Sequence, residues 1–244
     1  MSHASGVCSP RFATVFYDLD GTLVDSRPGI EASLRVAFGA HLPGVAPPPL
    51  GAALGLPLKL MLRAALPAGC DERALSAVAL TFAGHYDVEG WRLSRPYPGV
   101  PGALADLAAA GVRQVVLTNK RLCPATAILA ANGLAPHIER LYTPDSASPP
   151  FDDKAAMARA AQVQCAALSD SLLVIGDSAD DLLMADACGA TFAAAAYGYG
   201  DATSELSARA VAGRGGSTPA APFVLQTAGE ITGLVLPERS KGGA

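Results

Sequence analysis

Three separated segments of the sequence place acidic, hydroxyl or basic side chains directly after short apolar runs. The side chains are Asp18 and Asp20 after residues 12–17, Thr118, Asn119 and Lys120 after 114–117, and Asp177, Ser178, Asp180 and Asp181 after 172–175. Runs of this length that contain β-branched and aromatic residues predict buried strands. Ligands of an open parallel sheet bind outside the carboxyl ends of its strands, so we expect these side chains to meet at one site.

The residue types in this group are suited to phosphoryl transfer. Several carboxylates in one crevice repel one another unless a cation binds, and Mg²⁺ prefers hard oxygen ligands beside a phosphate. An oriented Asp18 could attack phosphorus, and Asp20, two residues further along an extended segment, could transfer the proton. Thr118 with the following backbone N–H groups could bind phosphate oxygens, and Lys154 could neutralise the transferring group.

Predicted strands alternate with predicted helices along most of the chain. Strands are expected at 12–17, 114–117, 172–175, 190–194 and 223–225, and helices at 102–110, 124–132, 153–167 and 180–187. This alternation predicts an α/β fold, with a parallel sheet covered by helices on both faces. Lys154 lies at the start of the third of these helices, near the same edge of the sheet as the acidic residues.

One long segment interrupts the alternation. Residues 26–96 contain no convincing strand, and apolar residues recur there at helical spacing over 30–38, 57–66 and 71–86. We therefore expect a helical cap at 26–96, inserted into a core formed by 11–25 and 97–236. Residues 1–10 and 237–244 are expected to be flexible tails, and the Gly- and Pro-containing segment 213–222 a surface loop.

Composition excludes several classes of protein. The chain has 244 residues, of which 50% are hydrophobic and 16% charged, so intrinsic disorder is excluded. A net charge of −4 argues against a nucleic-acid partner, and no apolar run approaches the roughly 20 residues of a membrane span. The N-terminal residues lack the pattern of a secretory signal, so a cytoplasmic location is expected. Five cysteines without a CxxC pair indicate neither a disulfide framework nor a structural zinc site.

The motifs together resemble the haloacid dehalogenase-like hydrolase superfamily. Its four motifs are matched by DLDGTLVDS at 18–26, by LTN at 117–119, by Lys154 and by GDSADD at 176–181. The sequence is most similar to the phosphoglycolate phosphatase-like branch, which shares a YPG turn, here 97–99, and a YGYG loop, here 197–200. This resemblance implies a Rossmann-like, doubly wound parallel sheet with an inserted helical cap. It also implies an Mg²⁺-dependent phosphatase, a monomer or homodimer, that hydrolyses a small phosphomonoester through an aspartyl-phosphate.

The resemblance also implies a role for each matching residue. Asp18 is expected to be the nucleophile, and Asp20 the general acid and base. The metal would be held by the carboxylates of Asp18 and Asp177 and by the backbone carbonyl of Asp20. Asp181 and Ser178 would support the site, and Asp180 would be a bystander. The residues expected to hold the phosphate are Leu19, Gly21, Thr22, Thr118, Asn119 and Lys154.

Substrate and reaction remain open at several points. Many relatives have Lys-Pro at the third motif, whereas Ala155 follows Lys154 here, which weakens an assignment to phosphoglycolate; a nucleoside monophosphate is an alternative. A phosphoglucomutase-type phosphotransferase and a non-catalytic, phosphate-binding member of the family are alternatives to a phosphatase. A phosphonatase would need a cap lysine, for which Lys59 is the candidate, and Asp20 argues against a dehalogenase. Lys59 and Arg63 share one helix face, which we expect to be an exposed surface of the cap.

Overall fold

A computed structural model describes residues 9–211 and 222–236, and its centre is a parallel six-stranded sheet. The strands are β1 (Thr14–Tyr17), β4 (Arg113–Leu117), β5 (Arg140–Tyr142), β6 (Leu172–Gly176), β7 (Thr191–Ala195) and β8 (Phe223–Leu225). Their order across the sheet is β5-β4-β1-β6-β7-β8, and each neighbouring pair is parallel. The predicted α/β class is therefore confirmed.

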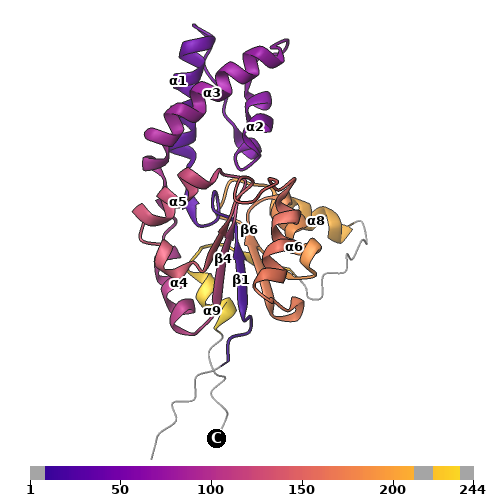
Figure 1. Ribbon diagram of the computed structural model, residues 1–244. Coiled ribbons are helices and arrows are strands. Elements are labelled where there is room, and N and C mark those ends of the chain that lie inside the picture. Colours follow the sequence, from indigo (N-terminus) through magenta and orange to yellow (C-terminus); the bar gives the residue numbers. More distant parts are fainter. Residues whose placement is uncertain (1–8, 212–221, 237–244) are drawn as a thin grey trace, which may run out of the picture.

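Helices cover both faces of this sheet (Figure 1). One face packs against α4 (Val100–Ala109), α5 (Leu122–Ala131) and α9 (Glu230–Val235), and the other against α6 (Lys154–Gln164), α7 (Ala179–Cys188) and α8 (Ala202–Val211). Because side chains alternate along a strand, Val15 and Tyr17 of β1 enter the first apolar cluster and Phe16 enters the second. Burial on both faces explains why the strands read as continuous apolar runs.

The strand order places the three polar segments side by side. β1 pairs with β4 on one side and with β6 on the other, so these three strands are adjacent at the centre of the sheet. All three run in the same direction, and their carboxyl ends lie at one edge. The chain order reverses around β1, which makes this edge the crevice in which doubly wound proteins bind ligands.

A separate group of helices stands beyond this edge (Figure 1). It consists of α1 (Arg27–His41), α2 (Leu58–Ala65) and α3 (Glu72–Val88), all in the segment where a helical cap is expected. These helices have an apolar cluster of their own, which includes the fully buried Leu34, Phe38 and Leu62. Asp71 caps α3, since its side chain accepts a hydrogen bond from the Ala74 N–H at 2.8 Å.

The structure also corrects the expected elements. Residues 26–96 were expected to contain no strand, but β3 (Arg95–Pro96) pairs antiparallel with β2 (Val24–Asp25). Strand β5 and helices α8 and α9 were not predicted, because they are too short or too weakly patterned to be recognised. Residues 1–8, 237–244 and 212–221, which hold nearly all of the predicted tails and loop, lie outside the described residues. No helix in the described part of the chain is long and apolar enough to cross a membrane.

Candidate active site

Asp18 and Lys154 meet at the carboxyl edge of the sheet. Asp18 directly follows β1, and Lys154 is the first residue of α6, whose N-cap Asp153 accepts a hydrogen bond from the Ala156 N–H at 2.7 Å. The Lys154 Nζ lies 2.7 Å from Asp18 Oδ1 and 2.6 Å from Asp181 Oδ1. Both members of the Asp18–Lys154 pair are buried. The structure thus brings together two residues that are 136 positions apart, as expected from their places at the end of a strand and the start of a helix.

Asp181 uses both of its carboxylate oxygens within the protein. Its Oδ1 accepts a hydrogen bond from Lys154, and its Oδ2 accepts bonds from the Ser178 N–H at 3.0 Å and the Ser178 hydroxyl at 2.7 Å. The contacts with Ser178 fix the first turn of α7, where an acidic side chain also interacts favourably with the helix dipole. Asp181 therefore orients the Lys154 ammonium.

Asp177 directly follows β6 and is surrounded by backbone groups. Its Oδ2 accepts hydrogen bonds from the N–H groups of Tyr199 at 3.0 Å and Gly200 at 2.8 Å. The approach of Gly21 is so close that a Cβ there would overlap the Asp177 carboxylate, and Gly21 has a φ of +85°. Only glycine satisfies both conditions without strain. The backbone therefore orients Asp177 with its Oδ1 available for another ligand.

Three carboxylates in this region could hold a metal ion. Asp18, Asp177 and Asp181 each offer an oxygen, and these oxygens lie within 4.8 Å of one another. All three residues are buried. A buried group of carboxylates with a single lysine fits a hard divalent cation. The Asp20 carboxylate is outside this group, and its predicted contribution was its backbone carbonyl.

Burial and mutual repulsion raise the pKa values of two of these carboxyl groups. Burial raises the pKa of Asp18 well above its usual range; Lys154 opposes this shift, and Asp181, Asp177 and Asp20 add to it. Burial, then the Asp181 charge, raises the pKa of Asp177 to about 7, against the lowering effect of the Gly200 and Tyr199 N–H groups. Excess negative charge is thus concentrated where a cation would relieve it.

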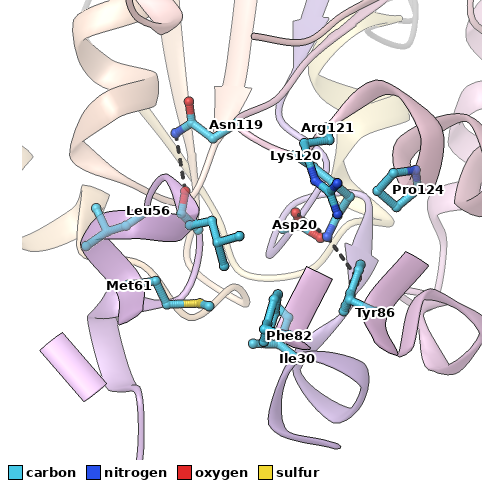
Figure 2. Close-up of a pocket in the computed structure, with 12 residues that line it drawn as sticks. Asp20, Ile30, Leu56, Met61, Phe82, Tyr86, Asn119, Lys120, Arg121 and Pro124 are labelled. Atoms are coloured by element: carbon cyan, nitrogen blue, oxygen red, sulfur yellow. Dashed lines mark hydrogen bonds and ion pairs between the residues drawn. The ribbon is translucent and has the colours of Figure 1, made fainter. Parts of the chain in front are cut away.

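Asp20 forms an ion pair with Lys120 in the pocket drawn in Figure 2. The Lys120 Nζ lies 3.0 Å from Asp20 Oδ2 and donates a hydrogen bond of 2.8 Å to the hydroxyl of Tyr86, a residue of the cap helix α3. Burial alone would lower the pKa of Lys120, but the Asp20 charge and the Tyr86 contact raise it above its usual range. The other Asp20 oxygen, Oδ1, is buried without a hydrogen-bond partner. That oxygen therefore has no competing partner among the described residues.

The second predicted motif lies at the same edge. Thr118 is buried after β4, and its hydroxyl oxygen accepts a hydrogen bond from the Lys120 N–H at 3.2 Å. The Asn119 side chain donates to the Gly55 carbonyl of the cap at 3.3 Å and to Asp180 Oδ2 at 3.2 Å. Asp180, expected to be a bystander, thus helps to hold a side chain that contacts the cap.

The loop after Asp18 is compact and buried. The Leu19 carbonyl accepts hydrogen bonds from the N–H groups of Leu23 and Val24 at 3.0 and 2.9 Å, which closes a tight turn. Thr22 is fully buried and its carbonyl accepts a bond from the Tyr197 hydroxyl at 2.9 Å, whereas its own hydroxyl has no partner. This supports a loop-fixing role for Thr22; binding of phosphate by Leu19, Gly21 and Thr22 stays a prediction.

Sequence reasoning missed several contacts of the site. Lys120 was expected at this edge of the sheet without a role of its own, and Tyr86 belongs to none of the motifs. The structure joins them to Asp20, and it brings the backbone of Tyr199 and Gly200 to Asp177. The YGYG pattern was the available signal for the latter contact. For Tyr86 the sequence carries no signal, because the contact depends on how the cap sits on the core.

The chain is similar to several known proteins. The model of the "haloacid dehalogenase-like hydrolase" family matches residues 12–189. Phosphoglycolate phosphatase of Caulobacter vibrioides is 32% identical over 191 residues, which cover 77% of this chain and 80% of the relative. Tyrosine-protein kinase PtkA of Mycobacterium tuberculosis is 34% identical over 192 residues; the match covers 77% of this chain but only 63% of PtkA.

A solved structure supports the same assignment of fold. A haloacid dehalogenase-like family hydrolase from Streptococcus pneumoniae superposes with a TM-score of 0.74 at 20% identity, over 91% of this chain and 97% of that one. The match of the family model covers more than half of the sequence, and the relative from Caulobacter matches over most of its length. The chain therefore belongs to the haloacid dehalogenase-like hydrolase family.

Proposed function

We propose that this protein is an Mg²⁺-dependent phosphatase that hydrolyses a small phosphomonoester through an aspartyl-phosphate on Asp18. The observation that carries this proposal is the contact of Asp18 with Lys154 beside Asp177, with Asp20 two residues further along the same loop. Asp18 would be the nucleophile, Lys154 the cation that meets the phosphoryl oxygens, and Asp20 the proton carrier. Relatives named as phosphatases, at 30–34% identity, support the same reaction.

The acidic group fits the proposed cofactor. Asp18 and Asp177 would hold the Mg²⁺ ion with their carboxylates, and the backbone carbonyl of Asp20 would complete the set of protein ligands. The bound ion would screen the charges of the nucleophile and the phosphoryl group from one another. Asp181 is not assigned as a ligand, because both of its oxygens already accept hydrogen bonds from Lys154 and Ser178.

The reaction would proceed in two displacements on phosphorus. The Asp18 carboxylate attacks the phosphoryl group, an Asp–O–P bond forms, and the bond to the ester oxygen breaks as Asp20 gives that oxygen a proton. Water then attacks the phosphorus, gives its proton to Asp20 and releases phosphate and the Asp18 carboxylate. Lys154 and the Thr118 hydroxyl would bind the equatorial oxygens, on which negative charge is spread in the transition state.

The cap is expected to limit the size of the substrate and the access of water. It contacts the core at two places beside the reacting groups, where Tyr86 meets Lys120 and Gly55 meets Asn119. A closed cap would exclude bulk water during transfer. The short β2–β3 pairing, Val24–Asp25 with Arg95–Pro96, joins the two chain connections between cap and core, so we place the hinge at 24–28 and 94–99.

Phosphate release from a panel of phosphomonoesters tests this proposal. The panel contains 2-phosphoglycolate, nucleoside monophosphates, sugar phosphates and an aryl phosphate, each assayed with Mg²⁺ and with EDTA. We expect Mg²⁺-dependent release by the wild type and its loss in Asp18→Asn. Equal release by wild type and Asp18→Asn would contradict the proposal. Isomerisation of a sugar 1-phosphate without net phosphate release would indicate the mutase instead.

The match to PtkA favours a second candidate, transfer of a phosphoryl group to a tyrosine. The same Asp18 site could pass its phosphoryl group to a phenol oxygen in place of water. Incubation with ATP and a tyrosine-containing peptide, followed by mass spectrometry, would distinguish the two. An 80 Da gain on the peptide would support the kinase, and release of inorganic phosphate from esters without any such gain would support the phosphatase.

A further inference from the structure

Two cavities flank the site, and the side chains of Asn119 and Leu56 line both of them. The first lies between cap and core and is shown in Figure 2; its apolar wall comes from the cap and includes Ile30, Met61 and Phe82. The second is a groove that reaches Lys154 and is lined by further apolar side chains. Those of the groove include Pro57, Leu60, Pro144, Phe151, Met157 and Leu183. Asp20 lines the first cavity, and Lys154, which contacts Asp18, lines the second. We therefore expect the alcohol part of an ester bound at Asp18 to enter one of these spaces.

The cations that line the two cavities are all neutralised. Lys120 pairs with Asp20 at 3.0 Å, and Arg121 pairs with Asp87 of the cap at 2.5 Å. Lys154 lies between Asp18 and Asp181. These three are the cations among the described residues that line the cavities. Each already has a carboxylate partner, so a second anionic group on a substrate would have to compete with that partner.

The remaining charges near the groove are negative. The groove is lined by three carboxylates, those of Asp152, Asp153 and Asp180. Asp153 accepts a hydrogen bond from the Ala156 N–H, and Asp180 accepts one from the Asn119 side chain. Neither of these uncharged donors neutralises the carboxylate that it contacts. The two basic residues of the cap helix α2, Lys59 and Arg63, do not offset these negative charges. Lys59 is exposed and lines neither cavity, and Arg63 pairs with Glu72 on the surface. An anionic group placed in the groove would face like charges without a counter-ion.

We infer that the substrate of this enzyme is a phosphomonoester whose alcohol part is uncharged and mainly apolar. Phosphomonoesters with a second anionic group, 2-phosphoglycolate among them, are discriminated against. The apolar side chains of the cap and the groove favour an apolar alcohol part. The cations already paired with carboxylates, together with the three carboxylates of the groove, disfavour a second anionic group on the substrate. This inference rests on the proposed phosphatase function, and it separates the chain from its relatives named for phosphoglycolate.

Matched substrate pairs test the inference. The first pair is 3-carbamoylphenyl phosphate and 3-carboxyphenyl phosphate, and the second is carbamoylmethyl phosphate and 2-phosphoglycolate. The members of each pair have nearly the same size and differ in one charge. We expect kcat/KM to be at least about tenfold higher for the amide in both pairs, the change that one unpaired like charge produces. Equal values, or higher values for the acid, would overturn the inference.

A variant pair shows whether the two cavities cause the selectivity. Leu56 lines both cavities and is 37% exposed, so it can be replaced without disturbing the core. Leu56→Lys adds an unpaired cation, and Leu56→Gln is its uncharged control. We expect Leu56→Lys to lower the amide-to-acid ratio at least about fivefold, and Leu56→Gln to change it less than about twofold. An equal ratio in both variants would contradict the assignment of the cavities.

A binding measurement separates this inference from the phosphatase proposal. Calorimetry with Mg²⁺-loaded wild type would compare 3-carbamoylbenzylphosphonate with 3-carboxybenzylphosphonate, neither of which can be hydrolysed. If no ester is hydrolysed but the amide phosphonate binds more tightly, the phosphatase proposal fails and the selectivity stands. If the acid binds as tightly as the amide, or neither binds, the selectivity inference fails whatever the activity.

Discussion

At the scale of single residues, the carboxylates of Asp177 and Asp181 differ in how many of their oxygens accept hydrogen bonds from the protein. Asp181 uses both oxygens on Lys154 and Ser178, whereas Asp177 uses one oxygen on the backbone of Tyr199 and Gly200. Both Asp181 oxygens thus have partners in the described part of the chain, whereas the backbone contacts of Asp177 use only its Oδ2, so we expect Asp177 rather than Asp181 to be the metal ligand. The two residues lie four positions apart, yet their substitution should have different consequences.

Replacement of each residue by asparagine tests this division. In Asp181→Asn, Lys154 loses a charged partner, so we expect kcat to fall about 10- to 100-fold with little change in the Mg²⁺ concentration at half-maximal activity. In Asp177→Asn, that Mg²⁺ concentration should rise strongly. Mg²⁺ titrations of activity for both variants give the comparison. A larger shift of the Mg²⁺ requirement in Asp181→Asn would mean that Asp181 is the ligand.

The raised pKa of Asp177 predicts how pH affects the stability of the metal-free protein. The pKa of about 7 in the folded protein exceeds the ordinary aspartate value of 3.8, so the folded state binds the proton more tightly. The free energy of unfolding without metal should therefore fall as pH rises from about 4 to about 7. The proposed Mg²⁺ ion would bind the ionised form and should therefore raise the melting temperature more at pH 8 than at pH 5.5. Equal stabilisation by Mg²⁺ at both pH values would contradict this account.

At this scale the sequence was a good guide wherever a residue belonged to a motif. Asp18, Lys154, Asp177 and Asp181 were predicted to converge, and they do, because each is fixed by the end of a strand or the start of a helix. The contact of Lys120 with Tyr86 was not predictable, since it joins the core to a cap whose orientation no local pattern specifies.

At the scale of elements, the turn after β1 depends on close approach of two backbones. Gly21 has a φ of +85° and faces the Asp177 carboxylate, which also contacts the loop at 199–200. These segments come from opposite ends of the core sequence. Because the backbone at residue 21 lies against the Asp177 carboxylate, a glycine there is needed for the site as well as for the turn.

Gly21→Ala should therefore damage both stability and metal binding. We expect a loss of at least about 1–2 kcal/mol in the free energy of unfolding from the left-handed backbone alone, and a raised Mg²⁺ requirement because Asp177 is displaced. Gly39→Ala, in helix α1 with open space around it, is the control and should be neutral or stabilising by about 0.5–1 kcal/mol. Urea unfolding and Mg²⁺ titration measure the two effects. A Gly21→Ala protein with wild-type Mg²⁺ affinity would refute the steric argument.

The strands also show which elements a sequence pattern can predict and which it cannot. Short, continuous apolar runs identified β1, β4, β6, β7 and β8, and buried parallel strands carry few polar residues. The edge strand β5 has three residues with one side partly open to solvent, and the β2–β3 pair has two residues in each strand. Such short ladders are fixed by their tertiary neighbours, so the hydrophobic periodicity of the sequence does not predict them.

At the scale of the whole molecule, the cap has an apolar core separate from those on the two faces of the sheet. Leu62 of α2 is fully buried in it, whereas Leu60 of the same helix is 55% exposed. Two leucines two positions apart thus offer a test of whether the cap depends on its own packing.

We expect Leu62→Ala to lower the free energy of unfolding of the cap by about 2–5 kcal/mol, as large-to-small changes in cores do. Leu60→Ala should change it by less than about 0.5 kcal/mol, the usual effect of a surface substitution. Hydrogen exchange resolved by peptide would show faster exchange across α1, α2 and α3 in Leu62→Ala, with β1, β4 and β6 unchanged. Equal loosening of the sheet would mean that cap and core unfold as one unit.

The central claim is that Asp18 carries the phosphoryl group during turnover. Acid quenching of the Mg²⁺-loaded protein with a hydrolysed ester, followed by peptide mass spectrometry, tests it most directly. We predict an 80 Da gain on the peptide that contains Asp18, its conversion to homoserine by borohydride, and the absence of both in Asp18→Asn. Steady hydrolysis without phosphorylation of Asp18, or phosphorylation of another residue in its place, would contradict the account.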